Sequence, residues 1–328
     1  GVDVGAGDAI GVGGAGAVYV SDDGGYTWTT HSQSYHYLYS IAADPDDPDV
    51  AHACGYVYDS GNYNMAAMTT DDGGASWDVT TLASDARGRC IALSPADTDL
   101  VLAGGYVTGS YDPVLYLSGD GGASYTEVTP AGCSSEYYMQ SVGFHPTDPD
   151  RALAGTYYGV WLTTDGCSSW TKTQSQYYNY TMDHSPVDTD LVFAGGYNGV
   201  YRSTDGGLSF SSYSSGLSGN LFESTEVSPA DATLAYAANS AGFFRSTDIG
   251  VTWEASNSGI LVGEVLAYTW HDGSSTLYKS MADMGIYKTD SYGSGWEQLN
   301  MPLACGDVCG IAVSPTNPDL ILALEGDG

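Results

Sequence analysis

Ser203-Thr-Asp-Gly-Gly-Leu-Ser-Phe210 is one copy of the eight-residue phrase that decides the fold, Ser/Thr-x-Asp-x-Gly-x-x-aromatic. The phrase occurs seven times, and the aromatic residues of successive copies lie 40 to 49 residues apart. In two copies Cys167 replaces the glycine and Ser291 replaces the aspartate. This period fits a four-stranded propeller blade better than a helical or leucine-rich repeat. The aspartates at the third position are Asp23, Asp72, Asp120, Asp165, Asp205 and Asp248.

Each copy of the phrase is expected to form a hairpin turn. An alternating segment such as Gly199–Ser203 precedes it, and a short segment that begins with an aromatic residue, such as Trp170–Thr173, follows it. The aspartate and Ser/Thr oxygens can accept hydrogen bonds from backbone N–H groups further along, and glycine supplies a positive φ. The prediction therefore gives these aspartates a structural role.

A second repeat lies between the copies and consists of an apolar strand, a Pro/Asp turn and another apolar strand, as in Ile91–Leu100. Each blade is then strand A, the Pro/Asp turn, strand B, a variable loop, strand C, the eight-residue phrase and strand D. The A–B and C–D turns share one face of the ring, and the B–C and D–A loops share the other. The second face carries the segments that differ between repeats, so we expect function there.

The predicted fold is all-β, a seven-bladed β-propeller of four-stranded antiparallel blades that forms a single domain over residues 1–328. Residues 8–14 match a strand B, and residues 311–328 supply one more A–B pair. The C-terminal strands would then close the ring against the N-terminal blade. Eight blades, or a fragment of a longer repeat array, stay open as alternatives.

The phrase and its spacing resemble the Asp-box, or BNR repeat, of sialidases, sortilin-type receptors, xyloglucan-cleaving glycoside hydrolases and photosystem II assembly factors. The resemblance covers nearly the whole chain and implies the propeller fold. In those families the Asp-box is a structural turn far from the active site, so the resemblance implies little about activity. Sialidases use three arginines and a Tyr–Glu pair. This chain has five arginines in all and no Phe/Tyr-Arg-Ile-Pro motif, which argues against a sialidase.

The chain is strongly acidic, with 8 Lys and Arg against 40 Asp and Glu and a net charge of −32. Nucleic acids and anionic membranes are therefore not expected partners, because both repel such a chain. No stretch reaches the roughly 20 apolar residues that cross a bilayer, and no secretory signal pattern is present. We expect a mature, soluble protein that is secreted, extracellular or on a cell surface.

Six cysteines allow 15 complete pairings, and the repeat frame favours some of them. Cys54 ends a strand B and Cys90 begins the next strand A, so a Cys54–Cys90 disulfide is expected first. Cys305 and Cys309 share one loop and are the second candidate pair. No set of four ligands has zinc-site spacing, so no metal site is predicted. Calcium stays open as a cofactor because of the acidic residues, and no other cofactor is predicted.

Residues six and eight positions before each strand-A proline are predicted to converge at the mouth of the central channel. In the sixth repeat, which lacks the proline, Trp270 serves as the reference. Aromatic faces stack on sugars, and carboxylates bind hydroxyls or act as acid and base. The ligand-binding candidates at the mouth and in the adjoining loops are Tyr37, Tyr39, Arg87, Arg89, Tyr137, Tyr138, Tyr178 and Tyr180, and the candidate catalytic carboxylates are Glu223 and Glu264.

The favoured function is a non-catalytic propeller whose Tyr-rich loop face binds a glycan or an extracellular protein, or packs into a surface assembly. Tyrosine suits an interface because it gives a large contact area and a polar tip at low entropy cost, and the chain has 27 tyrosines. The alternative is a glycoside hydrolase that acts on a polysaccharide through Glu223 and Glu264.

Overall fold

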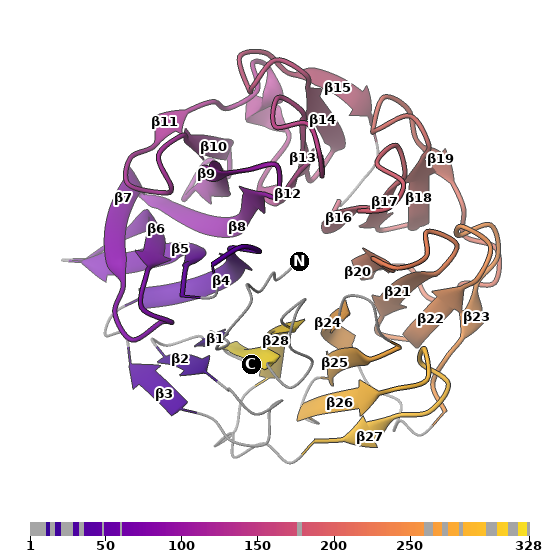
Figure 1. Ribbon diagram of the computed structural model, residues 1–328. Helices are drawn as coiled ribbons and strands as arrows, with labels where there is room; N and C mark the ends of the chain where they lie inside the picture. Colours follow the sequence, from indigo (N-terminus) through magenta and orange to yellow (C-terminus); the bar gives the residue numbers. More distant parts are fainter. Residues whose placement is uncertain are drawn as a thin grey trace.

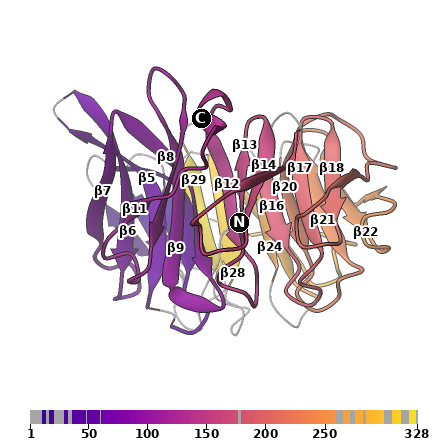
Figure 2. The same cartoon turned by 90° about the horizontal axis from the view of Figure 1, so that it is seen from above.

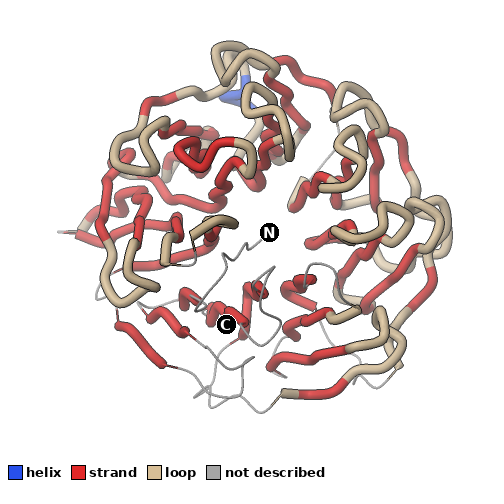
Figure 3. The backbone as a smooth tube through the Cα atoms, viewed as in Figure 1, coloured by secondary structure: helices blue, strands red, loops and turns tan. Residues whose placement is uncertain are grey.

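The computed structural model describes residues 11–13, 17–20, 29–32, 36–47, 49–59, 61–175, 179–258, 265–270, 275–281, 285–299, 307–313 and 321–326. These residues are almost entirely strand and loop (Figure 3), and the single described helix is the 3-10 turn η1 (Cys133–Ser135). Within this part of the chain no helix is long and apolar enough to cross a membrane. The prediction of an all-β chain is confirmed.

Six four-stranded antiparallel sheets are arranged in a ring (Figure 1). The first three are β4 (His36–Ala43), β5 (Ala51–Asp59), β6 (Asn62–Thr70) and β7 (Asp78–Ser84); β8 (Ala86–Ser94), β9 (Asp97–Val107), β10 (Pro113–Ser118) and β11 (Thr126–Glu127); and β12 (Met139–Phe144), β13 (Ala152–Thr156), β14 (Gly159–Thr163) and β15 (Thr171–Gln174). The other three are β16 (Thr181–His184), β17 (Val192–Gly196), β18 (Gly199–Ser203) and β19 (Ser211–Ser212); β20 (Phe222–Val227), β21 (Ala235–Asn239), β22 (Gly242–Ser246) and β23 (Glu254–Ala255); and β24 (Val265–Trp270), β25 (Leu277–Met281), β26 (Gly285–Thr289) and β27 (Glu297–Gln298).

Strands from the two ends of the chain complete the ring in Figure 1. β1 (Gly11–Gly13), β2 (Ala17–Val20) and β3 (Thr29–Ser32) form one sheet, and β28 (Asp307–Val313) pairs with β29 (Ile321–Gly326). β28 packs against β24 and β25, β1 packs against β4, and β29 lies against β1 and β2. The two ends therefore meet, as the closure prediction requires. The number of blades into which they combine stays a prediction.

In each sheet the strands follow one another from the centre of the ring to its rim (Figure 1), and Figure 2 shows them running roughly along the ring axis. The second strands β13, β17 and β21 are buried at every residue because each sheet is covered by a neighbour on both sides. The core is therefore a series of layers between sheets. One layer holds Phe193, Phe222, Phe244 and Trp253.

The eight-residue phrases form hydrogen-bonded turns between the third and fourth strands of their sheets. In the copy at 203–210, Asp205 Oδ1 accepts the Ser203 hydroxyl at 2.6 Å and the Ser209 N–H at 2.9 Å, and Asp205 Oδ2 accepts the Ser209 hydroxyl at 2.6 Å. The Gly207 N–H donates to Ser203 Oγ at 2.8 Å. Four further copies repeat this pattern at Asp72, Asp120, Asp165 and Asp248. Asp23 lies outside the described residues.

Replacing Asp205 by alanine is expected to lower the free energy of unfolding by about 1–2 kcal/mol, because three hydrogen bonds to one carboxylate disappear and the Ser209 N–H loses its acceptor. Urea denaturation measures the change. Asp188→Ala removes an exposed aspartate from the turn between β16 and β17 and serves as the control. Equal stability of the two variants would contradict a structural role for the Asp205 carboxylate.

The predicted Cys54–Cys90 disulfide is wrong, because both residues are free thiols. Cys54 lies in the layer between sheets β4–β7 and β8–β11, and Cys90 lies in the next layer, where its thiol donates to the Met139 carbonyl at 3.8 Å. Sheet β8–β11 therefore stands between the two sulfurs. Cys133 and Cys167 are also free, whereas Cys305 and the Cys309 side chain lie outside the described residues. The four described cysteines therefore give no evidence for an oxidising compartment.

Candidate binding face

A β-bulge interrupts the innermost strand of most sheets at the same position. The pairing with the second strand skips one residue between Leu38 and Ser40 in β4, and equivalent shifts occur in β8, β12, β20, β24 and β28. A bulge bends the strand and redirects the side chain that loses its pairing partner. The skipped residues are Tyr39, Arg89, Gln140, Glu223, Leu266 and Cys309.

These bulges coincide with the positions that the sequence frame placed six residues before the strand-A proline, except in two repeats. In the fourth repeat that position is Tyr180, and the described pairing of β16, which starts at Thr181, contains no bulge. In β24 the skipped residue is Leu266, whereas counting from Trp270 had pointed to Glu264. Trp270 pairs with Leu277 in the same way as Val227 of the fifth repeat pairs with Ala235. Val227 lies two residues before Pro229, so the place of the missing proline is two residues after Trp270. The register therefore puts Leu266, not a carboxylate, at the position equivalent to Glu223. Glu264 and Tyr178 themselves lie outside the described residues.

Tyrosines from sheet β4–β7 gather around Arg87 of β8. Tyr37 stacks on Tyr56 with ring centroids 4.7 Å apart, and Tyr56 meets the edge of Tyr63 at 5.2 Å. The Arg87 guanidinium carbon lies 4.9 Å from the Tyr56 centroid and 4.2 Å from the Tyr63 centroid. These contacts are within cation–π range. Tyr39, in its bulge, is 48% exposed and lies 6.0 Å from Tyr56.

A second group of tyrosines surrounds Arg89 and continues the first. The Arg89 guanidinium carbon lies 5.3 Å from the Tyr106 ring and 5.1 Å from the Tyr138 ring, and its Nη1 donates to Gln140 Oε1 at 3.4 Å. Tyr106 is also the cross-strand neighbour of Arg87, which joins the two groups. We call this surface the tyrosine face. Its members are Tyr37, Tyr39, Tyr56, Tyr58, Tyr63, Tyr106, Tyr111, Tyr137, Tyr138, Tyr157 and Tyr158 together with Arg87 and Arg89.

The tyrosine face combines exposed rings with cations that have no carboxylate partner among the described residues. Tyr58, Tyr111 and Tyr137 are 40–44% exposed. The described ion pairs are Lys172–Glu136 and Lys288–Asp290, so Arg87 and Arg89 are in neither. Burial raises the pKa of the Tyr56 and Tyr138 hydroxyls, which therefore stay protonated and can donate hydrogen bonds. The surface offers stacking, hydrogen bonding and two fixed positive charges.

The structure brings together Tyr37, Tyr39, Arg87, Arg89, Tyr137 and Tyr138, six of the eight predicted ligand-binding residues. Tyr180 starts the next sheet, where its N–H donates to the Gly195 carbonyl. Among the described residues, no group of three or more His, Cys, Asp or Glu side chains is placed to hold a metal ion.

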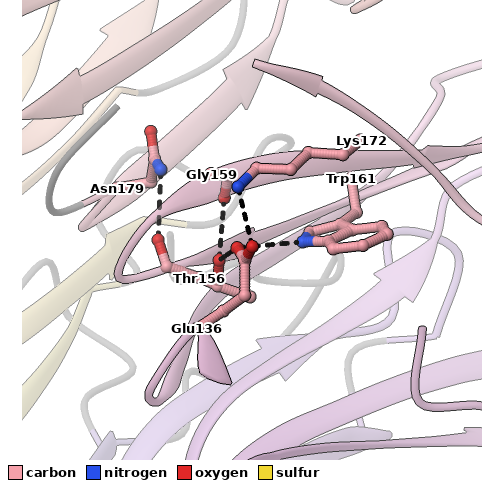
Figure 4. A network of polar contacts seen from close by, with 6 residues as sticks. All are labelled: Glu136, Thr156, Gly159, Trp161, Lys172 and Asn179. Atoms are coloured by element: carbon pink, nitrogen blue, oxygen red, sulfur yellow. Dashed lines mark hydrogen bonds and ion pairs between the residues drawn. The ribbon is translucent and has the colours of Figure 1, made fainter. Parts of the chain in front are cut away.

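Two parts of the site escaped the sequence analysis. Tyr63 lies on β6, outside the loops between repeats, and its ring packs against Arg87 beside Tyr56. Glu136, which directly precedes Tyr137 and Tyr138 in the chain, binds Lys172, Thr156 and Trp161 (Figure 4). Its isolated position before a strand carries no periodic signal. The tripeptide Glu136-Tyr137-Tyr138 occurs once in the chain, so no repeat drew attention to the glutamate.

No family model matches the chain, and neither does any curated protein sequence. Solved structures do match. YCF48 bound to D1 peptide is 14% identical, with TM-score 0.64 over 84% of this chain and 87% of that one. Chaetomium thermophilum Sqt1 bound to the N-terminus of ribosomal protein L10 is 15% identical, with TM-score 0.61 over 84% and 77%. The Niastella koreensis GH74 enzyme is 13% identical, with TM-score 0.51 over 96% of this chain but 61% of that one. These likenesses show a β-propeller fold.

Proposed function

We propose that this propeller is a non-catalytic binding module that holds a segment of a partner protein on its tyrosine face. The observation that carries the proposal is the continuous surface of tyrosine rings across sheets β4–β7, β8–β11 and β12–β15, with Arg87 and Arg89 set among them. Tyrosine and arginine are the side chains that concentrate at protein interfaces and at their energetic centres.

The protein-binding form of the proposal draws support from the similar folds. YCF48 is described as bound to D1 peptide and Sqt1 as bound to the N-terminus of ribosomal protein L10, so two propellers of this shape hold peptide segments. A glycan is the second candidate ligand, because exposed tyrosine rings beside a guanidinium also suit sugar stacking and hydroxyl recognition. Hydrolysis is the third, since one solved neighbour is a GH74 enzyme and Glu223 lies in a bulge of the same ring of strands.

The proposal extends to architecture and location. We infer that β28–β29 and β1–β3 combine into a seventh blade, because both groups occupy the sector between β24–β27 and β4–β7. The recurring turns, with their shared hydrogen bonds, support membership in the Asp-box group of propellers. A net charge of −32 supports a protein that works in a secreted or cell-surface setting, alone or in an assembly of copies.

A peptide-display selection on the immobilised chain, run beside a glycan array with hydrolysis products assayed, tests the function. We expect selected peptides to bind the wild-type chain and to lose at least about fivefold in affinity to Tyr137→Ala, since a tyrosine at the energetic centre of an interface contributes about 1 kcal/mol or more. Isothermal titration calorimetry measures the loss.

Tyr292→Ala is the matched control for Tyr137→Ala. Tyr292 is equally exposed at 40% and has a similar backbone, with φ 52° against 46°, but it lies in the turn between β26 and β27 at the opposite face of the ring. Binding that survives Tyr137→Ala as well as it survives Tyr292→Ala would refute the tyrosine face as the site. Glycan binding without peptides would move the proposal to its second candidate, and turnover to its third.

A further inference from the structure

Backbone strain is concentrated in one part of the tyrosine face. Tyr111, Tyr137 and Tyr138 have φ values of 65°, 46° and 49°, a left-handed conformation that bulky side chains rarely adopt. Their rings contact one another, with Tyr111–Tyr138 centroids 5.4 Å apart and Tyr111–Tyr137 centroids 6.4 Å apart. Such strain persists only where surrounding contacts impose it, and it tends to mark functional sites.

The residue before this pair, Glu136, is fastened to the neighbouring sheet by three side chains (Figure 4). Lys172 Nζ lies 2.7 Å from Glu136 Oε1, and Glu136 Oε2 accepts the Thr156 hydroxyl at 2.8 Å and the Trp161 indole N–H at 3.4 Å. These partners come from β15, β13 and β14, so one carboxylate is tied to three strands. Glu136 is buried, at 8% exposure, and every contact is charge-assisted.

Backbone hydrogen bonds on both sides of Glu136 also hold Tyr137 and Tyr138 in place. The Tyr138 N–H donates to the Tyr111 carbonyl at 3.0 Å, and the Tyr157 N–H donates to the Tyr137 carbonyl at 3.0 Å. On the other side, the Glu136 N–H donates to the Cys133 carbonyl at 2.8 Å in η1. The short segment from η1 to β12 is therefore held at both ends, and the two tyrosines between cannot relax without breaking one of these bonds.

We propose that Glu136 is a positioning residue that presets Tyr137 and Tyr138 for binding. Its carboxylate fixes the segment to sheet β12–β15 and so maintains the left-handed conformation that turns both rings onto the tyrosine face. The rings are then ordered before a ligand arrives, which lowers the entropy cost of binding. The anchoring is a property of the free chain, while its value for binding rests on the proposed function of this face.

Amide exchange in the free chain, labelled with ¹⁵N-tyrosine and followed by NMR, tests the positioning. In Glu136→Gln we expect the Tyr138 and Tyr157 amides to exchange at least about tenfold faster, because their bonds open once the ion pair is lost. The amides of Tyr201 in β18 and Tyr236 in β21 report global opening and should keep their wild-type rates. A residue that only stabilised the fold would raise all four rates together, and that result would overturn the proposal.

Thr156→Val removes one bond to Glu136 and keeps the charge, so it should move the same two amides by a smaller factor even if Glu136→Gln folds poorly. Asp290→Asn, which removes the charge from the exposed Lys288–Asp290 pair, should leave both rates unchanged. Unchanged Tyr138 and Tyr157 rates in both Glu136→Gln and Thr156→Val would overturn the proposal. Faster exchange together with undiminished binding of the selected peptides would keep Glu136 as the anchor of the segment but overturn its role in presetting the tyrosines for binding, whereas Tyr137→Ala tests the tyrosine face itself.

Discussion

Replacing Lys279 by methionine is expected to raise the free energy of unfolding by about 3 kcal/mol at pH 6. Lys279 lies on β25 with no exposed surface, and its Nζ has no hydrogen-bond partner among the residues that the structure describes. The nearest compensation is a pair of rings, with Nζ 4.3 Å from the Trp296 centroid and 5.1 Å from the Phe243 centroid. Methionine fills a similar volume, keeps the contacts with both rings and removes the cost of burying the charge.

The same lysine predicts how stability changes with pH. Burial lowers the pKa of Lys279 from 10.5 to about 7, so between these values the unfolded chain binds a proton that the folded chain does not. Stability of the wild-type chain should therefore rise as pH increases from about 7 to 10, and the full cost of the charge applies below pH 7. The advantage of Lys279→Met over the wild type should accordingly be largest at pH 6 and shrink towards pH 10.

Urea denaturation of both proteins at pH 6, 8 and 9.5 measures this dependence, since other titrating groups are common to the two. Lys288→Met is the matched control. Lys288 is on the adjacent strand β26 but pairs with Asp290 at 3.6 Å and is partly exposed, so its loss should change stability little at any of the three pH values. A Lys279→Met variant that is less stable than the wild type at pH 6 would show that the rings more than offset desolvation.

The repeats made the scaffold predictable, and they marked positions that the structure shows to be bulges, although the bulges themselves were not predicted. Tyr39, Arg89, Gln140 and Glu223 were all found by counting from a proline to a position that the structure shows to be a bulge. In the sixth repeat the missing proline removed the reference, and Leu266 holds the place. In the fourth repeat the count gave Tyr180, which lies just before the described, bulge-free pairing of β16. Counting from the proline thus located the bulge in five repeats that kept it.

Contacts between sheets were not predictable from the repeats. Cys54 and Cys90 are close along the predicted path, yet their side chains enter layers on opposite sides of sheet β8–β11. Lys279 pairs with Tyr287 in the same way as Ala237 of the preceding sheet pairs with Phe244, so the two residues hold equivalent strand positions. The burial of Lys279 follows from that position. Its positive charge does not, because the equivalent residue in the preceding sheet is an alanine. Glu136 and its partners are 20 to 36 residues apart and belong to one repeat only.

Replacing Gly105 by alanine is expected to destabilise the fold by about 3 kcal/mol and to disturb Arg89. Gly105 on β9 pairs with Gly88, directly beside the bulge that contains Arg89. A Cβ there would lie 2.1 Å from the Arg87 carbonyl oxygen and 2.9 Å from the Gly88 Cα. Both are backbone atoms, so no side-chain rotation relieves the clash, and strand β8 must move.

A shift of β8 would move Arg87 and Arg89, because both lie on this strand. Gly105→Ala therefore tests whether peptide binding depends on the positions that the strand and its bulge give to the two arginines. Gly119→Ala, in the turn that follows β10, is the control, because its Cβ would meet only the Leu100 Cδ2 at 3.9 Å, an ordinary contact. We expect Gly105→Ala to lower the midpoint of urea unfolding and to weaken the selected peptides even where the chain is fully folded, while Gly119→Ala does neither. If the folded Gly105→Ala chain bound those peptides normally, the geometry of Arg87 and Arg89 would be irrelevant to recognition, and the exposed tyrosines alone would have to account for it.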